Sequence, residues 1–112
     1  VLRVGARPVF VEVDLRSRNL DAAAVAAAVT PNTRAVIPVH FAGLAVDMEP
    51  LYELAAEHDL LLLEDAAQAI GTEYQGRKIG ASGNPVCFSF HPNKNMTTIE
   101  GGAVASNDAE CL

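Results

Sequence analysis

Four consecutive leucines, Leu60 to Leu63, constrain the fold more than any other feature, because they run directly into two carboxylates, Glu64 and Asp65. A short, unbroken apolar run predicts a strand that is buried on both faces, as in a parallel sheet covered by helices. Arg34 to Val39 predicts a second such strand, which Pro38 should end by removing a ladder donor. Both carboxylates are therefore expected at the carboxyl end of a strand, where open parallel α/β sheets bind ligands.

Two helices are predicted beside these strands. The alanine-rich segment Ala22 to Val29 has high helix propensity, and Asn19 or Asp21 can cap it by accepting from the free N–H groups of the first turn. A second helix should begin after a cap at Asp47 and end at Asp59. Its apolar face is formed by Met48, Leu51, Tyr52 and Ala55. This alternation of strands and helices predicts an α/β fold with a mainly parallel sheet and packed helices.

Five further segments are predicted as strands. Pro8 to Val13 is short and rich in β-branched and aromatic residues. Thr72 to Tyr74 and Arg77 to Ile79 flank Gln75-Gly76, a dipeptide typical of a tight hairpin turn. The remaining candidates are Val86 to Phe90 and Gly102 to Ser106.

Composition narrows the classes of partner. The chain has 112 residues, 14 acidic against 8 basic, a net charge of -6 and no basic cluster, so neither nucleic acid nor an anionic membrane surface is expected to bind it. Its apolar runs are too short to cross a bilayer, and a cytoplasmic location is expected. Cys87 and Cys111 lack metal-ligand spacing, so we expect no metal site and no disulfide framework. The absence of an initiator Met suggests an internal segment of a longer protein.

The segment from Ser89 to Gly102 places one lysine, Lys94, in a loop of small and polar residues between two predicted strands. Alone, a lysine in a loop is most often a solvated surface charge. Here it belongs to an ordered series of short motifs. These are Glu64-Asp65-Ala66-Ala67-Gln68-Ala69, Gly80-Ala81-Ser82-Gly83, Phe88-Ser89-Phe90, Lys94-Asn95 and Glu100-Gly101-Gly102, preceded by Gly5 to Val11 and Ile37 to Gly43.

In this order and spacing the motifs resemble the signature of the DegT/DnrJ/StrS family of pyridoxal-phosphate (PLP)-dependent sugar aminotransferases, over nearly the whole chain. The resemblance implies that Lys94 carries pyridoxal 5'-phosphate as a Schiff base and then acts as general base and acid. It implies that Asp65 pairs with the pyridine nitrogen and keeps it protonated. Gln68 would lie near the phenolic oxygen, and Ser89 would donate to the phosphate. Without the cofactor, Gln68 is an ordinary helix-surface amide and Ser89 a small residue near a strand end.

Four other ionisable residues lie near these motifs and can have structural or functional roles. His40 and His91 lie at predicted strand ends, where a structural hydrogen bond is favoured over contact with cofactor or substrate. His58 is expected to complement a helix dipole. Glu64 is left open between local structure and a supporting role in the site.

The resemblance also implies an activity. Residues 1–112 would be part of the large domain of a fold-type I PLP enzyme, with no second domain. The enzyme would transfer an amino group, usually from glutamate, to a keto group of a nucleotide-linked sugar, as a homodimer. The isolated segment is expected to be inactive, because the phosphate-binding helix N-terminus, the aromatic that stacks on the ring and the small domain are not among its motifs. Ile99 stands where many members carry glycine, which alters only the loop.

Three alternatives are weighed against this function. A related branch carries histidine in place of the lysine and dehydrates the sugar, and Lys94 favours transamination over that reaction. A non-catalytic or regulatory protein of the same fold stays open. A nucleotide triphosphatase is disfavoured, because the nearest P-loop candidate, Gly71 to Lys78, has its lysine one place late and lacks the following Ser or Thr.

Overall fold

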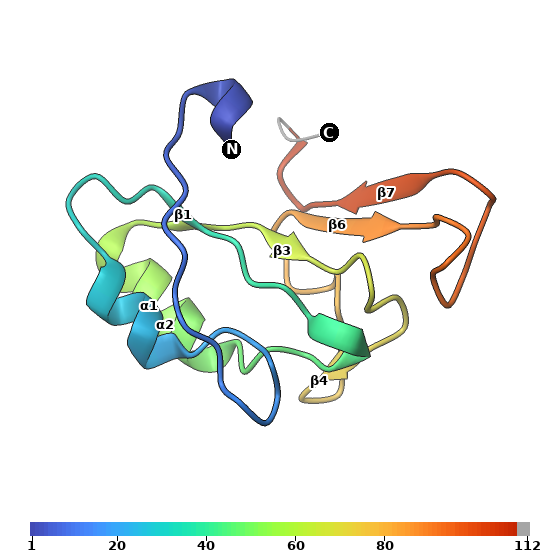
Figure 1. The fold of residues 1–112 in the computed structure, drawn as a ribbon, viewed down its shortest axis with the longest axis horizontal. Coiled ribbons are helices and arrows are strands. Elements are labelled where there is room, and N and C mark those ends of the chain that lie inside the picture. The colour runs from blue at the N-terminus through green and yellow to red at the C-terminus, as the bar shows by residue number, and fades with distance from the viewer. Residues whose placement is uncertain (110–112) are drawn as a thin grey trace.

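The chain forms a layer of short strands with two helices packed beside it (Figure 1). The computed structural model describes residues 1–109, so Cys111 lies outside the described residues. The strands of the layer are β1 (Ala35–Val36), β2 (Leu61–Leu62), β3 (Glu64–Asp65), β6 (Val86–Ser89) and β7 (Gly102–Ala105). β1 pairs with β2 and β3 with β6 in parallel, whereas β7 is antiparallel to β6. The predicted α/β fold with a mainly parallel sheet is confirmed.

β2 and β3 are consecutive pieces of one extended segment, which the backbone ladder joins to the segment that contains β1. The Leu63 N–H donates to the Val36 carbonyl at 3.0 Å, and the Asp65 N–H donates to the Pro38 carbonyl at 2.8 Å. A parallel bridge between Val39 and Asp65 extends the same pairing. The sheet therefore runs without a gap from β1 to β7.

Pro38 interrupts the strand without ending it. β1 stops at Val36, as expected where a proline supplies no ladder donor. Pairing then resumes, because the His40 N–H donates to the Asp65 carbonyl at 3.0 Å. The pairing thus ends within two residues of Pro38, close to the predicted end of the strand.

Both helices form where the sequence predicts them, but one cap differs. α1 (Ala22–Ala28) begins after Asp21, whose carboxylate accepts from the N–H groups of Ala23 and Ala24 at 2.8 and 3.4 Å. α2 (Glu49–His58) is preceded by Met48 rather than by a cap at Asp47, and Asp59 ends it in the left-handed region at φ 53°. The Asp47 carboxylate instead accepts a hydrogen bond from the Tyr74 hydroxyl at 2.6 Å. A tertiary contact therefore replaces the predicted cap.

The segment Pro8 to Val13 does not form the predicted strand. Its pairing within residues 1–109 is a single antiparallel bridge between Val13 and Leu20, and Phe10 is 93% exposed. A β-branched and aromatic composition favours a strand only where a neighbouring strand and a packed face are available. The segment before it contains a short 3₁₀ turn, Leu2–Val4.

Within the described residues, helices cover one face of the sheet. In the segments that contain β1 and β2, even-numbered residues such as Val36 and Leu62 pack against the helices. The odd-numbered residues Ile37, Val39 and Leu61 are exposed on the opposite face. The connection from β3 to β6 holds a hairpin rather than a helix, so it places no helix on the second face. The expected burial of both faces is therefore not seen. The core between sheet and helices consists of Val25, Val36, Val46, Met48, Leu51, Ala55 and Leu62.

The predicted hairpin is present as β4 (Glu73–Tyr74) and β5 (Arg77–Lys78), paired antiparallel. Gln75 and Gly76 have φ angles of 49° and 76°, and two positive values at the central positions are the signature of a type I′ turn. The hairpin packs Ile79 into a second small core with Ala66, Ala69 and Val86. Neither helix of the described region has the length and apolarity that a bilayer crossing needs.

Candidate active site

The pleat of the sheet separates the two adjacent carboxylates. Glu64 points toward the helices and is 1% exposed. Asp65 is the register partner of Cys87, and Ser89 follows Cys87 by two residues in β6. Side chains of paired residues, and of residues two apart along a strand, lie on the same face. Asp65 and Ser89 therefore share the face opposite the helices, near the carboxyl ends of β3 and β6.

Asp65 is fixed on both sides of its backbone. Its N–H donates to Pro38 and its carbonyl accepts from His40, so the neighbouring strand segment holds it in register. The Oδ1 atom accepts from the Ala67 N–H at 2.9 Å. Within residues 1–109, no hydrogen-bond partner contacts Oδ2. One carboxylate oxygen is thus anchored and the other is available to a ligand on the open face.

A hollow of about 370 Å³ lies beside this edge. It is lined by Ala42, Gly43, Gln68, Thr72, Asn93, Lys94 and Asn95. Its volume falls in the range of about 300–1,000 Å³ that small-molecule sites occupy. Two predicted site residues, Lys94 and Gln68, meet in this hollow, whereas Asp65 and Ser89 are not among the residues that line it.

Lys94 differs from the other lysine of the chain in its surroundings. Lys78 donates to the Gly71 carbonyl at 3.0 Å and forms an ion pair with Glu73 at 2.7 Å. Lys94 is half-buried, and its amine has no hydrogen-bond or ion-pair partner among the described residues. The surface-charge interpretation therefore fits Lys78 better than Lys94.

The loop that carries Lys94 is attached to the turn that follows Gln68. The Lys94 N–H donates to the His91 carbonyl at 2.9 Å, and the Asn95 amide donates to the Ile70 carbonyl at 3.3 Å. Asn93 Oδ1 accepts from the His91 ring at Nδ1, at 2.8 Å. His91 therefore makes a local structural contact, which is the favoured interpretation. Asn93 and Asn95 were not predicted as lining residues, although Asn95 belongs to one of the motifs.

The Gln68 side chain has a defined orientation. It lies in a turn, so its interpretation as a helix-surface amide is wrong. Its Oε1 accepts from the Ala42 N–H at 2.9 Å. This contact uses the carbonyl end of the amide and leaves the two donors on Nε2. Gln68 can therefore act as a donor to a ligand in the hollow.

Ser89 is the last residue of β6 and is half-buried. Its Oγ accepts a long hydrogen bond from the His91 N–H at 3.4 Å. The hydroxyl proton is not needed for this contact, so it can be donated elsewhere.

A buried network underlies the acidic edge. His40 is fully buried, and its Nε2 lies 3.0 Å from Glu64 Oε2. The Val46 N–H donates to His40 Nδ1 at 3.1 Å, so Nδ1 is an acceptor and the ring proton of the neutral form is on Nε2, facing the carboxylate. Glu64 Oε1 accepts from Ser82 Oγ and from Asn84 Nδ2. Both His40 and Glu64 thus have structural roles.

The charge state of Glu64 follows from this network. Burial raises the pKa of its carboxyl, but the hydrogen bonds from His40, Asn84 and Ser82 together outweigh burial and hold the pKa below the ordinary value. The carboxylate is therefore ionised at neutral pH. His58 is exposed in the last turn of α2, as expected for a residue near a helix C-terminus.

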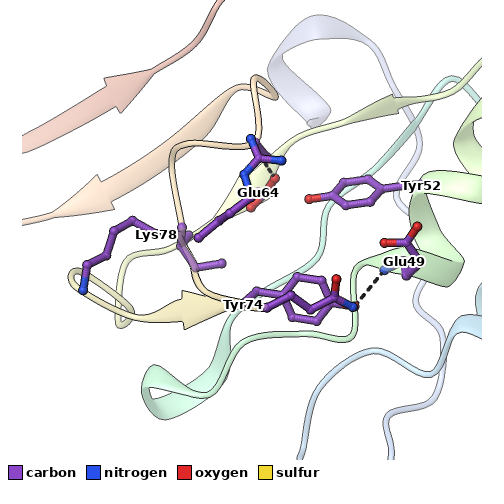
Figure 2. A pocket seen from close by; sticks show the side chains of 9 residues that line it. Glu49, Tyr52, Glu64, Tyr74 and Lys78 are labelled. Atoms are coloured by element: carbon purple, nitrogen blue, oxygen red, sulfur yellow. Dashed lines mark hydrogen bonds between the residues drawn. The ribbon is translucent and has the colours of Figure 1, made fainter.

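A second, smaller hollow of about 100 Å³ lies between α2 and the hairpin (Figure 2). Figure 2 shows Tyr52 and Glu49 on the side of α2 and Tyr74 below them. The Tyr74 hydroxyl accepts from the Glu49 N–H at 3.2 Å and donates to Asp47. Burial, followed by the nearby Glu64 charge, raises the pKa of Tyr52. The hollow is too small for a cofactor and belongs to the contact that docks the hairpin. No cluster of metal-binding side chains occurs among residues 1–109.

Three known proteins illustrate what the chain is similar to in sequence and structure. GDP-perosamine synthase of Caulobacter vibrioides is 50% identical over 104 residues, which cover 93% of this chain and 28% of that protein. PseC of Helicobacter pylori, an aminotransferase involved in the biosynthesis of pseudoaminic acid, superposes with a TM-score of 0.93 at 38% identity, over 97% of this chain and 29% of its own. DesI, solved in the presence of its TDP-sugar product, gives 0.90 at 45% identity over 97% and 28%. The chain thus spans less than a third of each relative.

The match to a family model extends along the whole sequence. The model of the DegT/DnrJ/EryC1/StrS aminotransferases covers residues 1–112. The motifs around Asp65, Ser89 and Lys94 therefore all lie within the matched region. By this match and by its close structural relatives, the chain belongs to the DegT/DnrJ/EryC1/StrS aminotransferase family.

Proposed function

We propose that the protein containing this chain is a PLP-dependent aminotransferase that moves an amino group, from glutamate, to a keto group of a nucleotide-linked sugar. The observation that carries the proposal is the half-buried Lys94, without an ion-pair partner among the described residues, facing the same hollow as the Gln68 amide. One relative that covers 93% of this chain is named GDP-perosamine synthase, and another, DesI, was solved in the presence of its TDP-sugar product. Residues 1–112 would be part of the large domain of a cytoplasmic homodimer.

The side chains present fit this cofactor. The hollow offers an amine at Lys94, amide donors at Gln68 and Asn95, and about 370 Å³ of space. On the same edge of the sheet, Asp65 presents a carboxylate oxygen and Ser89 a hydroxyl. Amine, carboxylate, amide and hydroxyl are the groups that a pyridine ring with an aldehyde, a phenolic oxygen and a phosphate requires.

Each of the four residues then has a defined role. PLP, when bound, supplies an electron sink for the carbon that loses a proton. Lys94 binds the cofactor through Nζ and, once released, takes up and returns the proton at that nitrogen. The Asp65 carboxylate holds a proton on the ring nitrogen, and its fixed backbone keeps it in place. Gln68 donates from Nε2 to the phenolic oxygen, and Ser89 donates from Oγ to the phosphate.

The two lysines of the chain provide a matched test in the intact protein. Borohydride reduction should attach the cofactor covalently to the peptide that contains Lys94, and peptide mass spectrometry should find Lys78 unmodified. Lys94→Ala should abolish turnover and the visible absorption of the bound cofactor. Lys78→Ala, which removes a surface ion pair of small energetic value, should leave both intact. Label on Lys78, or normal turnover by Lys94→Ala, would contradict the proposal.

A further inference from the structure

One wall of the hollow is an irregular loop, residues 41–46, whose backbone polar groups are bound mainly by side chains. It contains the 3₁₀ turn Phe41–Gly43. Two residues of this loop, Ala42 and Gly43, line the hollow. Both lie in the left-handed region, with φ angles of 52° and 82°. A residue with a Cβ is disfavoured in that region and persists there when its surroundings hold it.

The buried side chain of Asn19 holds both ends of the first part of this loop. Asn19 is 3% exposed and lies in the segment before α1, far from Lys94 in sequence. Its Oδ1 accepts from the Phe41 N–H at 2.9 Å, and its Nδ2 donates to the Leu44 carbonyl at 3.0 Å. The amide thus bridges the start and end of residues 41–44. It does not cap α1, because Asp21 does so.

Between these two ends, the loop is attached to residues of the hollow. The Ala42 N–H donates to Gln68 Oε1, and the Thr72 hydroxyl donates to the Gly43 carbonyl at 2.8 Å. The position of the Ala42 N–H therefore decides which end of the Gln68 amide faces the loop. If the loop moved, either the carbonyl or the amino end of Gln68 could face the ligand.

We propose that Asn19 is a positioning residue for the cofactor site: it holds residues 41–44 so that Ala42 orients the Gln68 amide with its donors toward the hollow. Asn19 itself lines no part of the hollow. The identity of the ligand rests on the proposed function, whereas the effect of Asn19 on the loop does not.

Asp21→Ala is a matched control for Asn19→Ala in the intact protein. It removes a helix cap two residues away, and so destabilises the same region, without contacting the loop. The first measurement is hydrogen exchange at single amides in the cofactor-free protein. The Phe41 and Ala42 amides should exchange about tenfold faster or more in Asn19→Ala, since two hydrogen bonds that hold the loop are lost. In Asp21→Ala they should exchange as in the wild type.

The second measurement is the dissociation constant for PLP, followed by absorbance. It should rise about 3- to 10-fold in Asn19→Ala, because a smaller fraction of the protein has the loop in place, and should not rise in Asp21→Ala. Asn19→Asp, which conserves size, keeps an acceptor for the Phe41 N–H but loses the donor to Leu44. It should restore slow exchange at Phe41 and give an intermediate dissociation constant.

The outcomes separate the two proposals. Unchanged exchange at Phe41 and Ala42 in Asn19→Ala, or equal changes in Asp21→Ala, would overturn the role of Asn19. A wild-type protein that binds no PLP would overturn the proposed function, and the exchange data would still decide whether Asn19 holds the loop. Should Asn19→Ala fail to fold, the dissociation constants of Asn19→Asp and Asp21→Ala decide the question: a rise in Asn19→Asp alone supports the role of Asn19, and equal values overturn it.

Discussion

Glu64 offers a sharp test of how the acidic edge is stabilised. Its buried carboxylate accepts hydrogen bonds from His40 Nε2 at 3.0 Å, Ser82 Oγ at 2.8 Å and Asn84 Nδ2 at 2.9 Å. Glu64→Leu has a similar volume and leaves all three donors without an acceptor. The three orphaned donors cost about 1–3 kcal/mol each, or about 3–9 kcal/mol together, and apolar burial of the leucine recovers about 2 kcal/mol. We expect the free energy of unfolding to fall by about 1–7 kcal/mol, with about 4 kcal/mol as the central value.

Glu64→Gln should be much milder, for a reason specific to this network. The Gln oxygen can still accept from His40, while its amino group can donate to Ser82 Oγ and to Asn84 if that amide turns its oxygen inward. The opposite orientation would require His40 to accept at Nε2, which its bond from the Val46 N–H opposes. We expect a loss of about 1 kcal/mol, from charged hydrogen bonds becoming neutral ones. Urea denaturation of the three proteins at pH 7 measures both values.

The difference between wild type and Glu64→Gln should also depend on pH. The pKa of Glu64 in the folded protein lies below its ordinary value of 4.5, because its hydrogen bonds outweigh burial. The unfolded chain therefore takes up the proton first as the pH falls. The contribution of the carboxylate is present above pH 4.5 and declines as the pH drops through the folded pKa. Equal losses in the Leu and Gln variants, or a gap that widens in acid, would refute this account of the network.

Two further substitutions test how the flanking elements are attached. Tyr74→Phe removes a hydroxyl that contacts Asp47, the Glu49 N–H and Gln75. It should lower the free energy of unfolding by about 1–2 kcal/mol, measured as a lower melting temperature. An unchanged melting temperature would show that these exposed hydrogen bonds do not stabilise the fold. Gly102→Ala would place a Cβ 2.8 Å from the Phe88 carbonyl oxygen in the paired strand, so β6 and β7 must separate, at about 1–3 kcal/mol. Ala103→Ser, at the exposed next position, should melt like the wild type.

Local patterns in the sequence predict the helices and the hairpin well because the physical causes are local. The alanine run and the Asp21 carboxylate are sufficient to define α1, and Gln75-Gly76 defines its turn by backbone conformation alone. Pro8 to Val13 fails for the opposite reason. A strand requires a partner. Within residues 1–109, the β-bridge that this segment forms is at Val13, to Leu20, and its other residues have no paired strand.

The sequence predicts two of the residues that line the hollow, but not their contacts. The motif order gives Lys94 and Gln68, and the structure brings both to one hollow. Asn19 illustrates what sequence patterns miss. Its position suggests a helix cap, and only the fold shows that its amide reaches a loop more than twenty residues away. Contacts between a buried amide and a distant backbone have no periodicity, so no pattern predicts them.

The adjacent residues Glu64 and Asp65 show why two neighbouring carboxylates need not act as a pair. Because side chains alternate along a strand, one faces the helices and the other the open face. Glu64 bonds the His40 ring, and the backbone N–H of the same His40 bonds the Asp65 carbonyl at 3.0 Å. The buried carboxylate therefore fixes the backbone that carries the outward one. A loss of Glu64 should consequently weaken binding of the proposed cofactor through the position of Asp65, although Glu64 itself faces the helices.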